Sequence, residues 1–364
     1  MEIRIEPLQE NQKKLTCANP AELGFGRHFT DRMLVADWSE QQGWFDVRIV
    51  PYGPFLLEPS AAVFHYGQEA FEGLKAYRWN TGSVAIFRPE MNLKRLNRSA
   101  ARLVLPEVPA DLFIEGMKEL VRLERDWVPH PEGTSLYIRP ALIATEEALG
   151  VKPAGKCRFF IILSPVGAYY ATGFKPVRIL VEDRMVRAAP GGTGEAKTGG
   201  NYAASLIAGR EAVKRGFDQV LWLDAIQHRY VEEVGAMNIF FVIDNRLVTP
   251  PLSGSFLEGI TRDSIMKLAP TMGLSVEERP VAIDELMTGV RNGSVQEVFG
   301  TGTAAVVSPV GMLCYQNELA TIGDGAVGPV TQLLYDTLTG IQYGRLPDRF
   351  GWMQELCADA IGNI

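Results

Sequence analysis

Short hydrophobic runs, broken by glycine, proline and polar turns, recur along the whole chain. An apolar run of strand length between turn signals, or an alternation of apolar and polar residues, predicts a β-strand. Strands are expected over residues 134–140, 159–163, 177–182, 220–224, 239–243 and 295–299. In the first of these, Tyr137 and Arg139 share one face, and Leu136 and Ile138 share the other.

Helical spacing occurs at fewer places. One stripe of apolar residues predicts a helix that begins at Asp111 as its cap, and its members are Phe113, Met117, Leu120 and Val121. A second helix is expected from about Tyr202 to Arg215, with Asn201 as its N-cap and Gly216 as its C-terminal stop. Another begins near Thr261. Strands and helices thus mix along the chain, which indicates an α+β protein.

Glycine and other small residues gather in residues 167–176, between two of the expected strands. Such a stretch is typical of a linker. It predicts a small N-terminal domain over residues 1–166 and a larger domain over residues 177–364. A length of 364 residues suits two domains.

Composition excludes several classes of protein. The chain is 46% hydrophobic and 22% charged, which excludes wholesale disorder, and its net charge of −7 gives no global basic footprint for nucleic acid. The most apolar stretch, residues 159–174, is interrupted and too short for a membrane span. The cysteines and histidines form no metal-ligand motif, so no metal is expected. Widely spaced cysteines and a polar N-terminus favour a cytoplasmic protein, with small molecules rather than nucleic acid or membrane as partners.

The glycine-rich stretch Gly191–Tyr202 contains Lys197 and leaves three interpretations open. A phosphate-binding P-loop requires a second glycine where Ala196 stands, and it follows its strand directly. A surface loop with a solvated lysine is the second interpretation. The third is a lysine among small residues, where a flat cofactor approaches the backbone and reacts with the amine.

Two further stretches suit a phosphate. Gly300–Ala305 matches a short dinucleotide fingerprint, and Leu257–Ser264 resembles the start of a helix, whose N–H groups and dipole attract anions. Phosphate and amine chemistry together point to pyridoxal phosphate. Its ring nitrogen needs a carboxylate partner, which either Glu232 or Glu233 could supply, because adjacent strand residues face opposite sides.

The chain resembles the branched-chain amino-acid aminotransferases of the pyridoxal-phosphate fold-type IV group. The resemblance covers about residues 23–352. It rests on residues 29–33, 65–67, 71–76, 87–89, 92–99, 133–140, 165–169, 197–202, 233–238, 259–261, 299–304 and 341–344. It implies a two-domain fold with a small N-terminal α/β domain and a larger C-terminal pseudo-barrel domain.

The same resemblance implies roles for individual residues. Lys197 is implied as the catalytic lysine that binds the cofactor and moves the proton, Glu233 as the partner of the ring nitrogen, and Tyr202 as that of the phenolic oxygen. The implied cofactor-binding set is Arg95, Lys197, Tyr202, Glu233, Gly259, Ile260, Thr261, Gly302 and Thr303. The implied substrate-binding set is Phe25, Tyr66, Phe71, Gly73, Tyr137, Arg139, Val151, Tyr169, Ala236 and Ala304, with Val151 reaching in from a partner subunit and Arg139 meeting the distal carboxylate of glutamate.

The implied activity is reversible amino transfer between leucine, isoleucine or valine and 2-oxoglutarate, in two half-reactions through pyridoxamine phosphate, by a homodimer. A D-amino-acid aminotransferase of the same fold is the alternative within the group. A P-loop phosphotransferase and a dinucleotide-binding protein are the alternatives outside it. The chain has Ala305 and Ser308 where vertebrate members carry a redox Cys-x-x-Cys, so no thiol switch is expected there.

Overall fold

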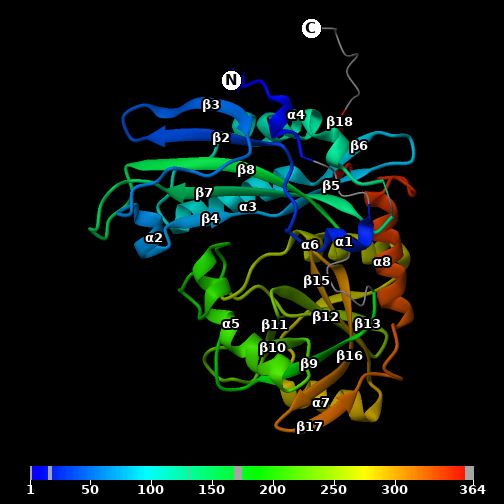
Figure 1. Cartoon of the computed structure of the whole chain (residues 1–364). Coiled ribbons are helices and arrows are strands. Elements are labelled where there is room, and N and C mark those ends of the chain that lie inside the picture. Colours follow the sequence, from blue (N-terminus) through cyan, green and yellow to red (C-terminus); the bar gives the residue numbers. More distant parts are fainter. Residues whose placement is uncertain (1, 15–18, 131, 168–173, 357–364) are drawn as a thin grey trace. The chain divides into compact units, whose positions relative to one another are not determined.

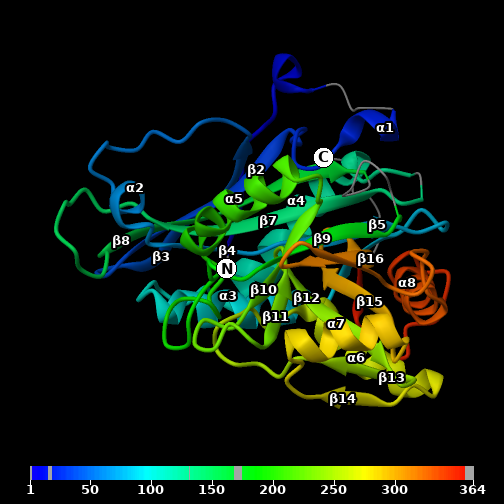
Figure 2. The ribbon, with the colours of Figure 1, turned by 90° about the horizontal axis from the view of Figure 1, so that it is seen from below.

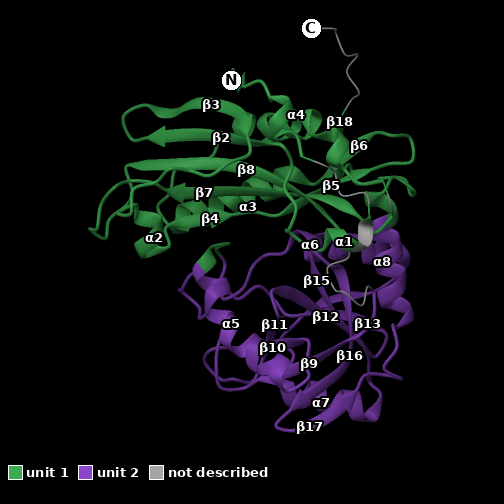
Figure 3. Ribbon diagram, in the orientation of Figure 1, with its two compact units in different colours: residues 1–171, 196–199, 340–364 green, residues 172–195, 200–339 purple. Residues whose placement is uncertain are grey.

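A computed structural model describes residues 2–14, 19–130, 132–167 and 174–356 of the chain. The chain forms two compact units, which Figure 3 colours separately. Unit 1 comprises residues 1–171, 196–199 and 340–364, and unit 2 comprises residues 172–195 and 200–339. Residues 168–173 of the expected linker lie outside the described residues, so the domain boundaries at 166 and 177 stay predictions.

A nine-stranded sheet runs through unit 1 (Figure 1). Its strands, in order, are β1 (Arg4–Ile5), β3 (Gly43–Pro51), β2 (Arg32–Ser39), β8 (Lys156–Val166), β7 (Ser135–Ala144), β5 (Leu74–Arg78), β6 (Val84–Phe87) and β18 (Met353–Leu356), and β4 (Glu69–Phe71) also pairs with β7. The expected strands 134–140 and 159–163 are confirmed: β7 begins one residue later than expected, and both β7 and β8 are longer. Each residue of β7 from Ser135 to Ala144 has a partner on β8.

One face of this sheet forms the core of unit 1. Leu136, Ile138 and Leu142 of β7 belong to that core. Helices α3 (Pro89–Arg102) and α4 (Gly116–Leu123) contribute Leu96 and Met117 to the same core. Because side chains alternate along a strand, Tyr137 and Arg139 lie on the opposite face, as expected.

The helical stripe found in the sequence is confirmed. Phe113, Met117, Leu120 and Val121 are all fully buried. The helix differs at its start, where residues Asp111–Glu115 form a π-helical turn, η2, ahead of α4. The N-cap position belongs to Ala110, and the Asp111 carboxylate accepts the neighbouring N–H of Leu112 instead of capping the helix. The remaining short helices of unit 1 are η1 (Glu10–Gln12), α1 (Pro20–Leu23), α2 (Ala62–Tyr66) and η3 (Arg125–Trp127).

The sheet of unit 2 closes on itself. Its strands, in order, are β11 (Val231–Val234), β10 (Gln219–Leu223), β9 (Val177–Glu182), β16 (Val306–Tyr315), β15 (Val295–Gly302), β12 (Met237–Ile243), β13 (Arg246–Thr249) and β14 (Val276–Glu278), with β17 (Glu318–Thr321) beside β16. A further pairing joins β11 to β12, so β11, β10, β9, β16, β15 and β12 form a closed ring. This ring confirms the expected barrel, and the four strands expected here lie in β9, β10, β12 and β15.

Helices α6 (Ile260–Leu268) and α7 (Ile283–Asn292) both pack against β15, as Figure 2 shows from below. The other helices are η4 (Ala269–Met272), α8 (Pro329–Gln342) and α5 (Gly199–Lys214). Helix α5 begins earlier than expected, and Asn201 is not its N-cap. The Asn201 amide instead donates to the Thr193 carbonyl at 2.7 Å and accepts from the Thr193 hydroxyl at 2.8 Å. The helix ends at Lys214, two residues before Gly216, whose φ of +80° suits a glycine stop.

Among the described residues, no helix combines the length and the apolar character that a membrane crossing requires.

Asp224 organises the turn between β10 and β11. Its carboxylate accepts backbone N–H groups from Ile226, Gln227, Arg229 and Tyr230, at 3.2, 2.7, 2.8 and 2.7 Å. Burial alone would raise the pKa of Asp224, but these donors lower it below its ordinary value. The turn sets where β11 begins, and β11 carries Glu232 and Glu233.

We therefore expect Asp224→Asn to lower the free energy of unfolding by about 1.5–3 kcal/mol at pH 7, since hydrogen bonds to a charged group are lost. The pKa of Asp224 is lower in the folded protein than in the unfolded chain. Its contribution to the free energy of unfolding is therefore complete above the unfolded pKa and disappears as pH falls through the folded pKa. Urea unfolding at pH 7 and at acidic pH measures both. Asp324→Asn is the control, because the Asp324 carboxylate accepts a single described N–H, from Ala326 at 2.9 Å. Equal losses in the two variants would contradict this role of Asp224.

Candidate active site

The Lys197 segment, residues 196–199, belongs to unit 1. The Lys197 N–H donates to the Ser99 hydroxyl at 2.9 Å, and the Lys197 carbonyl accepts the Phe71 N–H at 3.0 Å. The Lys197 Nζ lies 4.8 Å from the centre of the Phe71 ring. Backbone contacts to β4 and α3 therefore fix the position from which the half-buried Lys197 side chain extends.

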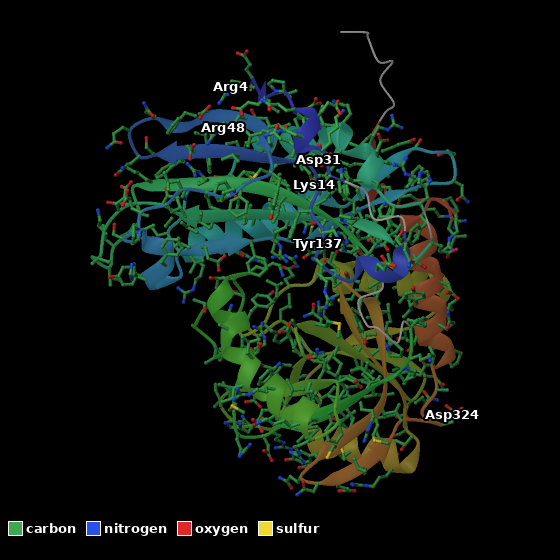
Figure 4. All side chains as sticks on the ribbon, viewed as in Figure 1. Arg4, Lys14, Asp31, Arg48, Tyr137 and Asp324 are labelled. Atoms are coloured by element: carbon green, nitrogen blue, oxygen red, sulfur yellow. The ribbon has the colours of Figure 1, made fainter. Side chains whose placement is uncertain are left out.

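Aromatic rings and cations share the face of the unit 1 sheet opposite the core. The Arg139 guanidinium lies 4.8 Å from the Phe71 ring and 5.3 Å from the Tyr137 ring, and it donates to the Tyr137 hydroxyl at 3.1 Å. Phe25 meets Tyr137 edge-on, with ring centres 4.8 Å apart. Figure 4 labels Tyr137 on β7. The structure thus brings together Lys197 and four residues expected to bind substrate.

One detail shows that this cluster is tightly built. A Cβ on Gly73 would lie 2.0 Å from the Tyr137 hydroxyl oxygen, so only glycine fits there.

The Arg139 Nε is buried and has no hydrogen-bond partner among the described residues. A buried donor of this kind suits a carboxylate ligand, which a guanidinium binds with two parallel hydrogen bonds.

A second lysine shares this face, and no motif in the sequence points to it. Lys75 on β5 lies opposite Tyr137 in the ladder, which places both side chains on the same side of the sheet. Burial lowers the pKa of Lys75 to about 8. Its position inside a strand, with no surrounding motif, gave no signal in the sequence.

Arg95 is buried in an ion pair rather than on a solvated helix face. Its Nε and Nη2 donate to the two carboxylate oxygens of Glu72 at 2.7 and 2.8 Å. The same carboxylate accepts the Asn92 amide at 2.7 Å and the Gly73 N–H at 3.1 Å. Burial opposes the charge on Glu72, but Arg95 holds its pKa below the ordinary value. The role expected for Arg95, phosphate binding, stays a prediction.

Three other residues were expected to bind substrate. The Tyr66 hydroxyl donates to the Leu149 carbonyl, and Tyr66 is partly exposed. Val151 is 84% exposed. Tyr169 lies outside the described residues.

In unit 2, Glu233 and Glu232 face opposite sides of β11. The Glu233 carboxylate is ion-paired to the Arg187 Nε at 2.5 Å and accepts the Asn238 amide at 3.3 Å. The Glu232 carboxylate accepts hydroxyls from Ser255 and, at 3.3 Å, from Ser253. Burial raises the pKa of Glu232. Of the two acids, Glu233 therefore has the cationic partner.

Arg187 is a residue that the sequence analysis missed. Only 10% of the Arg187 side chain is exposed. Its Nη2 donates to the Gly194 carbonyl at 3.3 Å. Arg187 stands in an irregular segment before the glycine-rich stretch, where no period predicts its direction. Its pairing with Glu233 becomes visible only once β11 is in place.

The two stretches expected to bind phosphate both lie in unit 2. Gly259 occupies the N-cap of α6, where it has no side chain, and Ile260 and Thr261 open the helix and are buried. A Cβ on Gly259 would lie 1.9 Å from the Asn238 side-chain oxygen, so glycine is required. The first N–H groups of a helix lack partners within it, and together with the dipole they suit an anion.

Gly302 ends β15, and Thr303 and Ala304 belong to the turn that joins β15 to β16. Gly302 pairs with Val306 across this turn, so the segment does not open a helix, and the dinucleotide interpretation of Gly300–Ala305 is wrong. Val306 has φ +62°, which is unusual for a β-branched residue. The tight turn thus holds its backbone in a strained conformation. Ala236 lies in the two-residue turn between β11 and β12, and Tyr202 lies in the first turns of α5.

These residues fit pyridoxal phosphate by their chemistry. A lysine is fixed among small residues, a buried carboxylate pairs with a cation, and a helix start with a glycine cap suits a phosphate. A metal is not needed for this chemistry, and among the described residues no group of three or more His, Cys, Asp or Glu could hold one.

Comparison with known proteins agrees with the chemistry. The family model described as "Amino-transferase class IV" matches residues 69–312. The "Branched-chain-amino-acid aminotransferase 2" of Bacillus subtilis (strain 168) is 52% identical, over 98% of this chain and 97% of its own. The "Branched-chain-amino-acid aminotransferase" of Mycolicibacterium smegmatis is 51% identical, over 96% of each chain.

Solved structures show the same likeness. The branched-chain amino acid aminotransferase of Escherichia coli is similar with a TM-score of 0.75 and 29% identity, over 88% of this chain and 99% of its own. The branched-chain aminotransferase of the thermophilic archaeon Thermoproteus uzoniensis, solved with norvaline, is similar with a TM-score of 0.72 and 27% identity, over 89% and 100%. The expected fold is therefore confirmed.

The Arg187–Glu233 pair makes a prediction about stability. Arg187→Leu leaves the Glu233 carboxylate buried without its guanidinium, which costs about 3–5 kcal/mol of unfolding free energy. Glu233→Gln in the same chain should recover much of this loss, because the unpaired charge is gone. Urea unfolding of the cofactor-free protein measures both.

The matched control is Arg291→Leu, which breaks an exposed ion pair with Glu318. Exposed pairs contribute about 0–1 kcal/mol. A loss in Arg187→Leu no larger than in this control would contradict the importance of the buried pair.

Proposed function

The chain belongs to the class IV aminotransferase family, and we propose that it is a pyridoxal-phosphate-dependent branched-chain amino-acid aminotransferase, acting between leucine, isoleucine or valine and 2-oxoglutarate. Relatives more than half identical over nearly the whole chain carry this activity in their names. The alternative, a D-amino-acid aminotransferase, is not favoured, since these relatives are named as branched-chain-amino-acid aminotransferases. The observation that carries the proposal is the Lys197 amine beside the Phe71 ring, which the Arg139 guanidinium also contacts.

Bound pyridoxal phosphate supplies the electron sink that makes the α-proton of an amino acid removable. Lys197 is proposed to bind the cofactor through Nζ and to carry the proton to and from the substrate α-carbon. Its fixed backbone supports this role, because proton transfer requires a base within hydrogen-bond reach. The nearby Phe71 ring shields the amine from water on one side.

Other residues are proposed to hold the cofactor. Glu233 keeps the ring nitrogen protonated, and the cation of Arg187 supports this by favouring the charged carboxylate. Tyr202 binds the phenolic oxygen. The phosphate is assigned to the remaining expected residues, namely Arg95, Gly259, Ile260, Thr261, Gly302 and Thr303.

The substrate is proposed to lie against the aromatic face of unit 1. Phe71, Tyr137 and Phe25 offer apolar walls to the side chain of leucine, and Gly73 leaves room for them. Arg139 binds the distal carboxylate of glutamate, supported by its buried Nε. The backbone N–H groups of Ala236 and Ala304 are assigned to the α-carboxylate, and Tyr66 and Tyr169 complete the expected lining.

We further propose that the enzyme is a homodimer and works in the cytoplasm. Unit 1 exposes several large apolar side chains: Leu56 is 97% exposed, Phe64 60%, Leu149 63% and Val151 84%. Such residues are typical of an interface. A partner's copy of Val151 is assigned to the substrate site. The buried thiols of Cys157 and Cys314 are free, as is usual in a reducing compartment.

The proposed function predicts the behaviour of Lys197→Ala. This variant should still bind pyridoxal phosphate through the phosphate contacts but lose nearly all turnover, because nucleophile and proton carrier vanish together. Borohydride reduction of the wild-type protein followed by peptide mapping should label Lys197. Lys94→Ala, an exposed lysine on α3, is the control. Label on a different lysine would refute the assignment.

Substrate selection gives a separate prediction for Arg139→Gln. A charge-assisted hydrogen bond is worth ~1.5–3 kcal/mol, so kcat/KM for glutamate and 2-oxoglutarate should fall roughly 10- to 150-fold. The half-reaction with leucine, which brings no distal carboxylate, should change much less. Cofactor absorbance in separate half-reactions measures each. An equal loss for both substrates would mean that Arg139 supports the fold or the shared α-carboxylate.

A further inference from the structure

The Lys197 segment has a second anchor, at its C-terminal end. The Glu69 carboxylate of β4 accepts the Thr198 hydroxyl at 3.3 Å and the Gly199 N–H, both through Oε1. These partners are 129 and 130 positions away in the chain. The anchor is thus separate from the Phe71 and Ser99 contacts, which hold Lys197 itself.

Strand β4 is short, and both of its outward side chains serve this segment. Ala70 is buried in the core, so Glu69 and Phe71 lie together on the other side. The Phe71 ring lies near the Lys197 Nζ, and the Glu69 carboxylate holds the next two residues. Pairing with β7, where Glu69 lies opposite Ile143 and Phe71 opposite Ala141, fixes the strand in place.

The Gly199 N–H depends on Glu69 for its partner. Gly199 is the first residue of α5, and the first N–H groups of a helix find no acceptor within it. A carboxylate at a helix start is also favoured by the dipole. A Cβ on Gly199 would lie 2.7 Å from the Glu69 Oε1, so a side chain at this position would push the carboxylate aside.

We propose that Glu69 is a positioning residue, whose carboxylate clamps Thr198 and Gly199 to β4 and thereby fixes the direction in which Lys197 reaches the cofactor. This inference rests on the proposed function, because it assigns Lys197 to the cofactor. The action of Glu69 is assigned to the segment that it holds, through Thr198 and Gly199. Without the clamp, the backbone after Lys197 is free to move, and the amine spends less time in the reactive direction.

The test compares Glu69→Ala with Glu69→Gln in the full chain. Alanine removes the acceptor, whereas glutamine keeps a carbonyl oxygen that can accept both donors. Amide hydrogen exchange at Gly199, measured by mass spectrometry on the cofactor-free protein, reports the clamp directly. The rate at which added pyridoxal phosphate is trapped by borohydride on Lys197 measures how readily the Lys197 amine reaches the cofactor.

In Glu69→Ala, exchange at Gly199 should be roughly 10- to 150-fold faster, and trapping on Lys197 should slow by a factor of the same order. Glu69→Gln should bring both the exchange rate at Gly199 and the trapping rate on Lys197 most of the way back to the wild-type values. Gln68→Ala is the matched control: it removes a side-chain hydrogen bond to the Leu103 carbonyl from the adjacent residue and should change neither rate.

Gly199→Ala gives an independent check, including the case that Glu69→Ala does not fold. Its methyl group displaces the carboxylate, so it should slow trapping as Glu69→Ala does, and the double variant should be no slower than either single one. The clamp would be overturned if the two substitutions slowed trapping additively in the double variant. It would also be overturned if Glu69→Ala changed neither exchange at Gly199 nor trapping on Lys197. Failure of the wild-type protein to trap cofactor on Lys197 would instead refute the proposed function, while exchange at Gly199 would still decide whether the clamp exists.

Discussion

Buried charge needs a partner, and this requirement shapes the candidate site in each unit. An ion taken out of water loses several kcal/mol of solvation unless an opposite charge and hydrogen bonds replace it. Unit 1 meets the requirement with Arg95 and Glu72, whose carboxylate accepts four donors. Unit 2 meets it with Arg187 and Glu233. Residues assigned to the cofactor thus sit in networks that fix their positions before any ligand arrives.

Strand alternation explains how unit 1 can offer a polar face at all. The apolar side chains of β5 and β7 enter the core with Leu136 and Leu74, so the intervening positions are free for chemistry. Lys75, Tyr137 and Arg139 occupy those positions, and Phe71 on β4 joins them. One well-packed face therefore supports rings and cations on the other, and a shift of register by one residue would exchange the two sets.

The sequence predicted those parts of the fold that depend on local pattern. The strand period located the polar face with Tyr137 and Arg139, and the helical stripe located the buried face around Met117. It failed where a side chain had a tertiary partner: Asn201 was expected to cap α5, but its amide is bound to Thr193. Glu69 and Arg187 gave no signal, because each acts on a segment that is distant in the chain. The role proposed for Lys197 rests on resemblance, since no period distinguishes a reactive lysine from a solvated one.

The choice between Glu232 and Glu233 shows what tertiary structure adds. Strand geometry says only that the two acids face opposite ways, and both are buried. Their surroundings differ in charge: hydroxyl groups hold Glu232, and burial raises its pKa, whereas Glu233 meets a guanidinium. A carboxylate that must keep a ring nitrogen protonated has to stay ionised itself, and an adjacent cation favours the ionised form. The Asn238 amide also donates to Glu233, so an amide and a cation together hold this carboxylate in place.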